Sequence, residues 1–116
     1  LLPVTADPRD VRWQDDPGWV LKAAWCNTGD TVAAVDVTPA PRWAQLSGQA
    51  RRRPERWIVQ RRFEPLRVST PWGDLLSCIG VYTVNGKTAG AYARVTRRPF
   101  VDGHATDVAL LVGDHD

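Results

Sequence analysis

The chain has no methionine, only two cysteines and only two histidines, and its acidic and basic residues nearly balance. The net charge of +2 over 116 residues is too small to indicate a nucleic-acid-binding protein by itself. No apolar run approaches the roughly 20 residues that a membrane-spanning helix needs. Because the missing methionine includes the initiator, we expect residues 1–116 to be a fragment of a longer chain. A trimmed or processed natural domain is the alternative.

The scarcity of cysteine bears on the cellular compartment. Cys26 and Cys78 could pair, but the first residues, LLPVTADP, have neither the basic segment nor the long apolar segment of a secretory signal. We therefore predict a cytoplasmic protein with reduced thiols. Cys78 lies in an apolar segment and is expected to be a small core residue. The cysteines and histidines lack the spacing of a metal site, so no metal ligands are expected in this chain.

An α+β fold with a mainly antiparallel sheet and one or two helices is predicted, because hairpin signals outnumber crossover signals. Strands are expected over Gly18–Trp25 and Thr31–Val37, joined by the loop Cys26–Asp30. Apolar residues at helical spacing indicate a helix within Pro39–Arg56, which Pro54 ends. A chain of this length is expected to form one domain.

The second half of the chain is expected to hold further strands. A strand is expected over Trp57–Phe63, WIVQRRF, which begins with apolar and β-branched residues. Cys78–Val84 and Ala89–Val95 flank an Asn-Gly dipeptide at 85–86, which a two-residue hairpin turn prefers because both positions need φ > 0. The small residues of this hairpin, Gly90, Ala91 and Ala93, allow another group to approach its backbone closely. Val108–Val112 predicts a last, buried strand.

Lys22 and the loop after it are the first candidates for a ligand site. Strand alternation places Lys22 on the face shared by Val20 and Ala24. Its ammonium can bind phosphate as a point charge, or it can simply reach solvent. Residues Asn27–Asp30 offer backbone N–H groups and a hydroxyl that can cradle phosphate, although such sequences also form plain turns.

Gln60 and Arg94 are the next candidates. Gln60 ends an apolar strand with a polar group, where backbone atoms can bind a planar base; a strand that leaves the core is the alternative. Arg94 lies on the second hairpin strand, and its guanidinium can clamp an anion and offset the charge that develops in phosphoryl transfer. A solvent-facing strand residue is the alternative.

Basic residues interleave with aromatic residues in the middle of the chain. This pattern can bind single-stranded nucleic acid through phosphate pairing and base stacking. Acidic residues accompany the arginines at Glu55 and Glu64, so a solvated surface is the alternative. The interleaved residues are Arg51–Arg53, Arg56, Arg61, Arg62, Arg67, Trp43, Trp57 and Phe63.

Three short motifs, in order, resemble parts of the ATP-grasp ligases. GWVLKAAWCNTGD at 18–30 is similar to the Lys-bearing strand and flexible loop of that fold, and WIVQRRFEP at 57–65 to the strand that enters the adenine-contacting hinge. IGVYTVNGKTAGAYAR at 79–94 is similar to the following hairpin, which ends in a phosphate-contacting arginine. With the Leu-Leu-Pro start, the likeness is closest to the C-terminal part of the glutathionylspermidine synthase-like group, whose ATP-grasp fold is circularly permuted. The likeness covers nearly the whole chain.

The resemblance implies that residues 1–116 are a partial ATP-grasp lobe of an ATP- and magnesium-dependent carboxylate–amine ligase that works through an acyl-phosphate. Each motif then implies a role. Lys22 would contact the nucleotide phosphates, and Arg94 would act as the catalytic residue near the transferred phosphate and the acceptor carboxylate. The remaining implied cofactor-binding residues are Thr28, Gly29 and Asp30 in the phosphate-covering loop and Val59, Gln60 and Arg61 along the adenine site, mostly through their backbone.

The chain departs from the family pattern in two places. The loop AWCNTGD lacks the Arg-Glu-Gly pattern of the glutathionylspermidine group, which puts glutathione as substrate in doubt. No Asp, Glu and Asn set matches the magnesium site, so we expect the magnesium ligands outside this chain and the isolated chain to be inactive. The implied partners are ATP, a small carboxylate, an amine and the remaining lobe of the parent protein, with no membrane; nucleic acid belongs only to the alternative.

Overall fold

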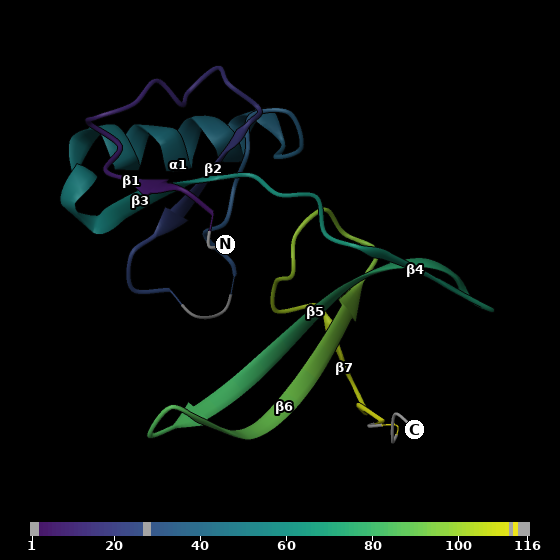
Figure 1. Ribbon diagram of the computed structural model, residues 1–116. Helices are drawn as coiled ribbons and strands as arrows, with labels where there is room; N and C mark the ends of the chain where they lie inside the picture. Colours follow the sequence, from purple (N-terminus) through teal and green to yellow (C-terminus); the bar gives the residue numbers. More distant parts are fainter. Residues whose placement is uncertain (1–2, 27–28, 112, 114–116) are drawn as a thin grey trace. The chain divides into compact units, whose positions relative to one another are not determined.

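The computed structural model describes residues 3–26, 29–111 and 113 (Figure 1). Over these residues the chain is α+β, with one α-helix, one short 3₁₀ helix and two antiparallel sheets. The predicted fold class and the mainly antiparallel pairing are therefore confirmed. The chain divides into two compact units, Leu1–Glu64 and Pro65–Asp116, and each is described by itself. The single ATP-grasp-like lobe over 1–116 stays a prediction.

The first unit is a small sheet covered on one face by a helix (Figure 1). Its middle strand, β3, pairs antiparallel with β1 on one side and with β2 on the other. The elements are β1 (Thr5–Ala6), β2 (Trp19–Ala23), α1 (Ala40–Arg52), the 3₁₀ helix η1 (Pro54–Arg56) and β3 (Trp57–Arg61).

The predicted helix is present and ends where its sequence requires. Pro41 lies in the first turn, where a missing N–H costs nothing. Arg51 and Arg52 occupy the last turn, where cations are favourable beside the negative helix end. Pro54 cannot continue α1 and starts η1 instead. None of the helices in the described part of the chain is long and apolar enough to cross a membrane.

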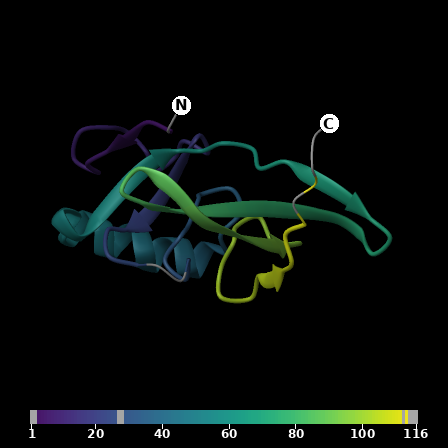
Figure 2. The ribbon, with the colours of Figure 1, turned by 60° about the horizontal axis from the view of Figure 1, so that its bottom comes forward.

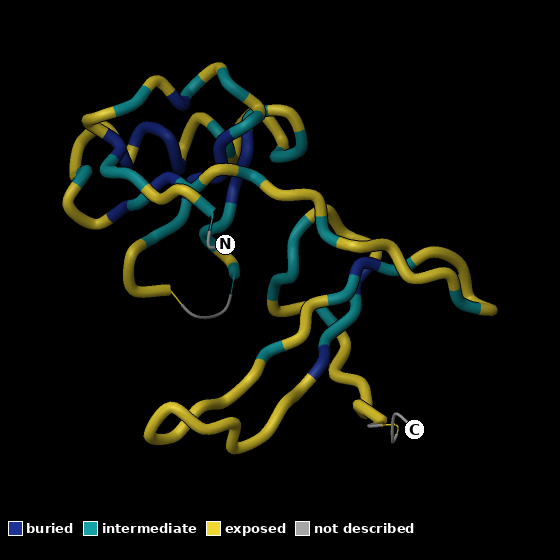
Figure 3. The backbone as a smooth tube through the Cα atoms, in the orientation of Figure 1, coloured by how far each residue is buried: buried dark blue, intermediate teal, exposed yellow. Residues whose placement is uncertain are grey.

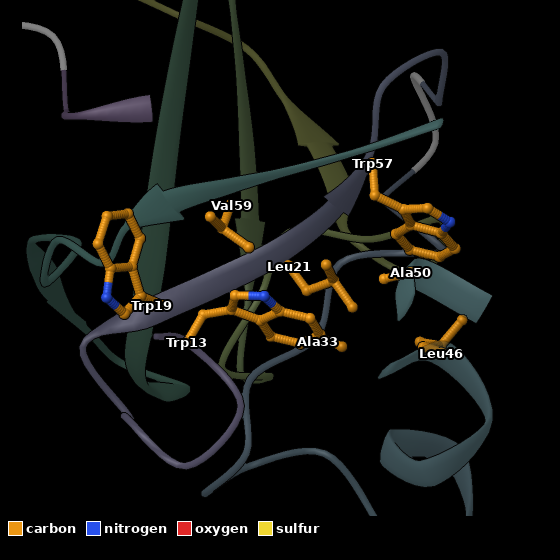
Figure 4. Close-up of a cluster of buried hydrophobic side chains, with 8 residues drawn as sticks. All are labelled: Trp13, Trp19, Leu21, Ala33, Leu46, Ala50, Trp57 and Val59. Atoms are coloured by element: carbon orange, nitrogen blue, oxygen red, sulfur yellow. The ribbon is translucent and has the colours of Figure 1, made fainter. Parts of the chain in front are cut away.

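Tryptophan and aliphatic side chains fill the space between α1 and the sheet (Figure 4). The indole N–H of Trp13, a fully buried side chain, donates to the Pro8 carbonyl at 3.0 Å, so its polar atom is satisfied. Trp43 packs edge-on against Trp13 at 5.8 Å between ring centroids. The buried cluster consists of Trp13, Trp19, Leu21, Ala33, Leu46, Ala50, Trp57 and Val59.

The strand predicted over Thr31–Val37 is wrong. Only Ala33 pairs with β2, through two hydrogen bonds of 2.8 and 2.9 Å with Leu21. The chain must then turn to enter α1, and the Thr38 hydroxyl accepts a hydrogen bond from the Ala34 N–H to close that turn. Because α1 begins at Ala40, soon after Ala33 in the sequence, the turn occupies the residues between them and no strand continues from the bridge.

The second unit is a four-stranded sheet in the order β4-β5-β6-β7. Its two middle strands form a long ribbon (Figure 2). Neither outer strand reaches the far end of the ribbon, since β4 pairs only with 73–76 and β7 only with 93–95. The strands are β4 (Arg67–Thr70), β5 (Gly73–Val84), β6 (Lys87–Thr96) and β7 (Thr106–Val108).

The predicted hairpin turn is confirmed, with φ of 49° at Asn85 and 75° at Gly86. A close approach on this hairpin occurs at Gly80, and not at Gly90, where the nearest side-chain atom lies at an ordinary contact distance of 4.0 Å. The Tyr92 ring lies against Gly80, where a Cβ would overlap it. Tyr92 in turn stacks with Tyr82 at 5.5 Å between ring centroids.

Two expectations for the second unit are wrong. Cys78 is exposed rather than a core residue. The last strand is the exposed β7 and not a buried strand over Val108–Val112; Leu111 is 91% exposed, and Val112 lies outside the described residues. The reason is that no helix or second sheet of this unit covers β7 or most of the β5–β6 ribbon over the described residues, and burial on the strands is confined to a few positions such as Leu76 and Ala93 (Figure 3).

Candidate functional site

Lys22 and Gln60 lie on the face of the first sheet that points away from α1. Trp19 and Leu21 of β2 and Val59 of β3 belong to the cluster under the helix (Figure 4). Because side chains alternate along a strand, the intervening residues lie on the opposite face. The face opposite α1 therefore combines two apolar and two polar side chains, Val20, Lys22, Ile58 and Gln60.

A chain of hydrogen bonds crosses the three strands on this face. The Lys22 ammonium donates to Oε1 of Gln60 at 2.6 Å. The Gln60 amide donates through Nε2 to Oγ1 of Thr5 at 3.3 Å, and the Thr5 hydroxyl donates to the Pro3 carbonyl. Two residues predicted from separate motifs, Lys22 and Gln60, thus come into direct contact.

Lys22 is a partly buried cation whose hydrogen-bond partner is neutral. Burial lowers the pKa of the Lys22 ammonium below its ordinary value of 10.5. Within the described segments, no carboxylate forms an ion pair with it. A desolvated ammonium with an amide partner keeps its full charge, which an oxyanion would complement.

Val59 and Arg61, also expected along the adenine site, lie on the other face. Val59 is fully buried in the core. The Arg61 guanidinium lies 4.2 Å from the Trp19 ring centroid and pairs with Asp16 at 3.3 Å. The backbone of β3 pairs with β1 and β2 on its two sides, so its polar groups are engaged there. The adenine-site roles of Val59, Gln60 and Arg61 stay predictions. Of these three side chains, that of Gln60 lies on the same face as Lys22.

The loop after β2 is described only in part, since Thr28 lies outside the described residues. Gly29 adopts a φ of 80°, and its carbonyl accepts from the Val32 N–H. The Asp30 carbonyl accepts from Arg42 of α1 at 3.1 Å. Thr31, which the sequence analysis did not select, has a buried hydroxyl without a hydrogen-bond partner among the described residues.

Arg94, in the second unit, is held by the connection between β6 and β7. Its Nη2 donates to the carbonyls of Asp102 and Ala105 at 3.1 and 3.3 Å. Its Nε lies 3.2 Å from Oδ1 of Asp107, close enough for an ion pair, although the angle does not make a hydrogen bond. The guanidinium therefore organises this connection, and an exposed carboxylate offsets part of its charge.

Asp102 gives the same connection a second anchor. Burial alone would raise the pKa of its carboxyl, but hydrogen bonds from the His104 N–H and from Arg98 lower it below its ordinary value. The Arg98–Asp102 distance is 2.9 Å. Arg94 and Asp102 together fix residues 97–107 beside β6, so loss of either side chain should loosen this connection.

The basic and aromatic residues do not form a continuous stacking surface. Trp57 belongs to the core, and Trp43 packs against it. Arg61 and Arg62 are paired with acidic residues, Arg62 with Asp36 at 2.8 Å. Phe63 remains 62% exposed.

The described residues hold no group of three or more His, Cys, Asp or Glu side chains that could bind a metal ion. A magnesium ion needs oxygen ligands, chiefly carboxylates. The expectation that these ligands lie outside this chain stays a prediction.

Comparison with protein-family models, with curated proteins and with solved structures found no match for this chain. The residues of the chain are therefore the only basis for inferring its function. Two features of the described residues bear most directly on function: the neutral hydrogen-bond partner of Lys22, and the Arg94 guanidinium, which is held by backbone carbonyls.

Proposed function

We propose that this chain is the nucleotide-binding part of an ATP- and magnesium-dependent carboxylate–amine ligase of the ATP-grasp type. The observation that carries the proposal is the Lys22 ammonium, partly buried, bonded to the neutral Gln60 side chain and without a carboxylate partner in the described part of the chain. A cation in this state favours binding of a polyanion such as a triphosphate.

The surroundings of Lys22 fit a nucleotide. Ile58, which is partly exposed, supplies apolar surface on the same face, whereas Val20 is buried. Ligand sites commonly combine an apolar lining with a few placed polar groups. Lys22 supplies the charge for the phosphates. The order of the three motifs along the chain is the further support, and it points to the glutathionylspermidine synthase-like group.

Arg94 is proposed to contact the transferred phosphate and the acceptor carboxylate. Its guanidinium is held by the 102 and 105 carbonyls, and a positioned donor needs little reorganisation when charge develops. Bound magnesium would neutralise charge on the β- and γ-phosphates. The parent enzyme, a cytoplasmic protein on this proposal, would join a carboxylate to an amine through an acyl-phosphate.

The test is a calorimetric titration of ATP, with magnesium, into the 116-residue chain and its variants. Lys22→Ala and Arg94→Ala are each expected to weaken binding by about tenfold or more, because each removes a charge-assisted contact to phosphate. Lys87→Ala and Arg67→Ala are the matched controls, since both residues are exposed on strands of the second unit. The controls should bind as the wild type does.

Two results would contradict the proposal. One is saturable binding that neither Lys22→Ala nor Arg94→Ala weakens while circular dichroism shows both variants folded. The other is tighter binding of single-stranded oligonucleotide than of ATP, with an affinity that collapses as salt rises. The second result would favour the nucleic-acid alternative.

A further inference from the structure

We propose that Gln60 is a positioning residue for Lys22, and that Thr5 fixes the Gln60 amide in the orientation this requires. Gln60 then serves the site by holding the ammonium, rather than by reading a base with its amide. The inference rests on the proposed function only for the nature of the anion, which would be the nucleotide phosphates.

The three residues come from three strands that pair side by side. Gln60 lies on the middle strand β3, opposite Thr5 of β1 and Val20 of β2. Lys22 is two residues beyond Val20 on the same face, the diagonal position that a long side chain can reach. The resulting Nζ–Oε1 distance of 2.6 Å is that of a short, charge-assisted hydrogen bond.

Only one orientation of the amide suits both neighbours. An ammonium has donors and no acceptor, so Oε1 of Gln60 must face Lys22 and Nε2 must face Thr5. The Thr5 hydroxyl donates its own hydrogen to the Pro3 carbonyl, which leaves its oxygen to accept from Nε2. Without that acceptor the amide could rotate and turn its NH₂ group toward the ammonium.

A neutral partner preserves the charge that the site needs. A glutamate at position 60 would hold Lys22 equally well but would cancel its charge and repel phosphate. A leucine would leave the ammonium partly buried with no acceptor beside it, which disfavours the charged form. Glutamine both positions the ammonium and leaves its charge available.

The chain has only two lysines, Lys22 and Lys87, which makes this arrangement measurable in the full 116-residue protein. Protein labelled with ¹³C-lysine gives two Cε signals, and their pH titrations can be followed separately by NMR. We expect Gln60→Glu to raise the pKa of Lys22 and Gln60→Leu to lower it. Thr5→Val should lower the pKa of Lys22 by less than Gln60→Leu does. Thr5→Ser keeps the hydroxyl and should therefore keep the wild-type pKa. The Lys87 titration should stay unchanged throughout.

ATP binding in the presence of magnesium is measured on the same variants. Gln60→Leu and Thr5→Val should weaken it about three- to tenfold, the range for losing one hydrogen bond at a charged group. Gln60→Glu should weaken ATP binding more than Gln60→Leu does, although glutamate is closest to glutamine in shape, because its charge cancels that of Lys22 and repels phosphate. Thr5 is exposed, so Thr5→Val and Thr5→Ser provide the test if a change at Gln60 prevents folding.

The outcomes separate the two proposals. A Lys22 titration that responds to Gln60 and Thr5 supports positioning even if the wild-type chain binds no ATP, in which case the proposed function fails alone. An unchanged Lys22 titration in folded variants overturns the positioning role. ATP binding that needs Lys22 but is indifferent to Gln60 and Thr5 also overturns it, while the proposed function stands.

Discussion

At the scale of the residue, burial of the charged Lys22 side chain lowers the free energy of unfolding. Its ammonium loses part of its hydration in the folded chain, which is why its pKa falls. The group therefore binds fewer protons when folded than when unfolded at alkaline pH. By linkage, the free energy of unfolding must rise with pH between the lowered folded pKa of Lys22 and the unfolded value of 10.5. The unfavourable contribution is fully present below the folded pKa.

Lys22→Met tests this linkage. The variant is expected to lack the Lys22 share of the rise in unfolding free energy toward pH 10.5, because methionine does not titrate. Urea unfolding at several pH values between 7 and 10.5 measures the slope of both proteins. Lys87→Met, at an exposed position of β6, is the control for replacing a lysine by methionine. Identical slopes in wild type and Lys22→Met would show that Lys22 is not desolvated.

At the scale of the element, turns and helix ends follow from local sequence, whereas strand pairing depends on tertiary packing. The turn at Asn85 and Gly86 and the end of α1 before Pro54 depend on the backbone preferences of those residues, so the sequence predicted both. The segment 31–37 has strand-like composition, yet only Ala33 pairs. Pairing depends on what lies beside a segment, which composition does not report.

The β5–β6 ribbon gives a prediction at this scale. Gly80→Ala would push a methyl group into the Tyr92 ring and break its stacking on Tyr82. The ring can swing toward solvent, so we expect a loss of about 1 kcal/mol in unfolding free energy, the value of an aromatic pair. Chemical denaturation of Gly80→Ala measures it.

The control is a double-mutant cycle with Tyr92→Ala. Once the ring is removed, Gly80→Ala should cost nothing or should stabilise the strand, because glycine weakens a strand interior. Additive costs for the two changes would contradict the packing of Tyr92 over Gly80.

At the scale of the whole molecule, the two units differ in what holds them together. Unit Leu1–Glu64 packs α1 against its sheet around four tryptophans, three of them in the buried cluster. In unit Pro65–Asp116 every residue from Val81 to Tyr92 is exposed. A two-stranded ribbon without a third strand or a covering layer is marginally stable in water.

Hydrogen exchange on the isolated chain should therefore be uneven. Amides of Leu21 and Val59 should exchange slowest, because they lie in the core sheet. Amides of residues 81–92 should exchange many times faster, and Leu76, where β4 and β6 flank β5, should be intermediate. Equal protection at Val59 and in residues 81–92 would mean that the ribbon is covered, for instance by a second copy of the chain.

The candidate site was predictable only as separate pieces. Sequence patterns selected Lys22, Gln60 and Arg94 because each is a polar residue set in an apolar strand, and the resemblance suggested their roles. No sequence pattern indicates Thr5 or Thr31. Thr5 of β1 contacts Gln60 of the neighbouring strand β3, and burial of the Thr31 hydroxyl depends on tertiary packing. The carbonyl partners of Arg94 come from a loop that has no motif.

The amino-acid sequence alone determined the α+β class, the hairpin turn and the limits of the helix, because these follow from local backbone preferences and from the spacing of apolar residues. Tertiary structure alone decided which strand lies in the middle of the first sheet, and hence that Gln60 meets Lys22 across 38 positions of sequence. It also decided that Cys78 and β7 stay exposed, since burial requires a second layer that the strand sequence cannot supply.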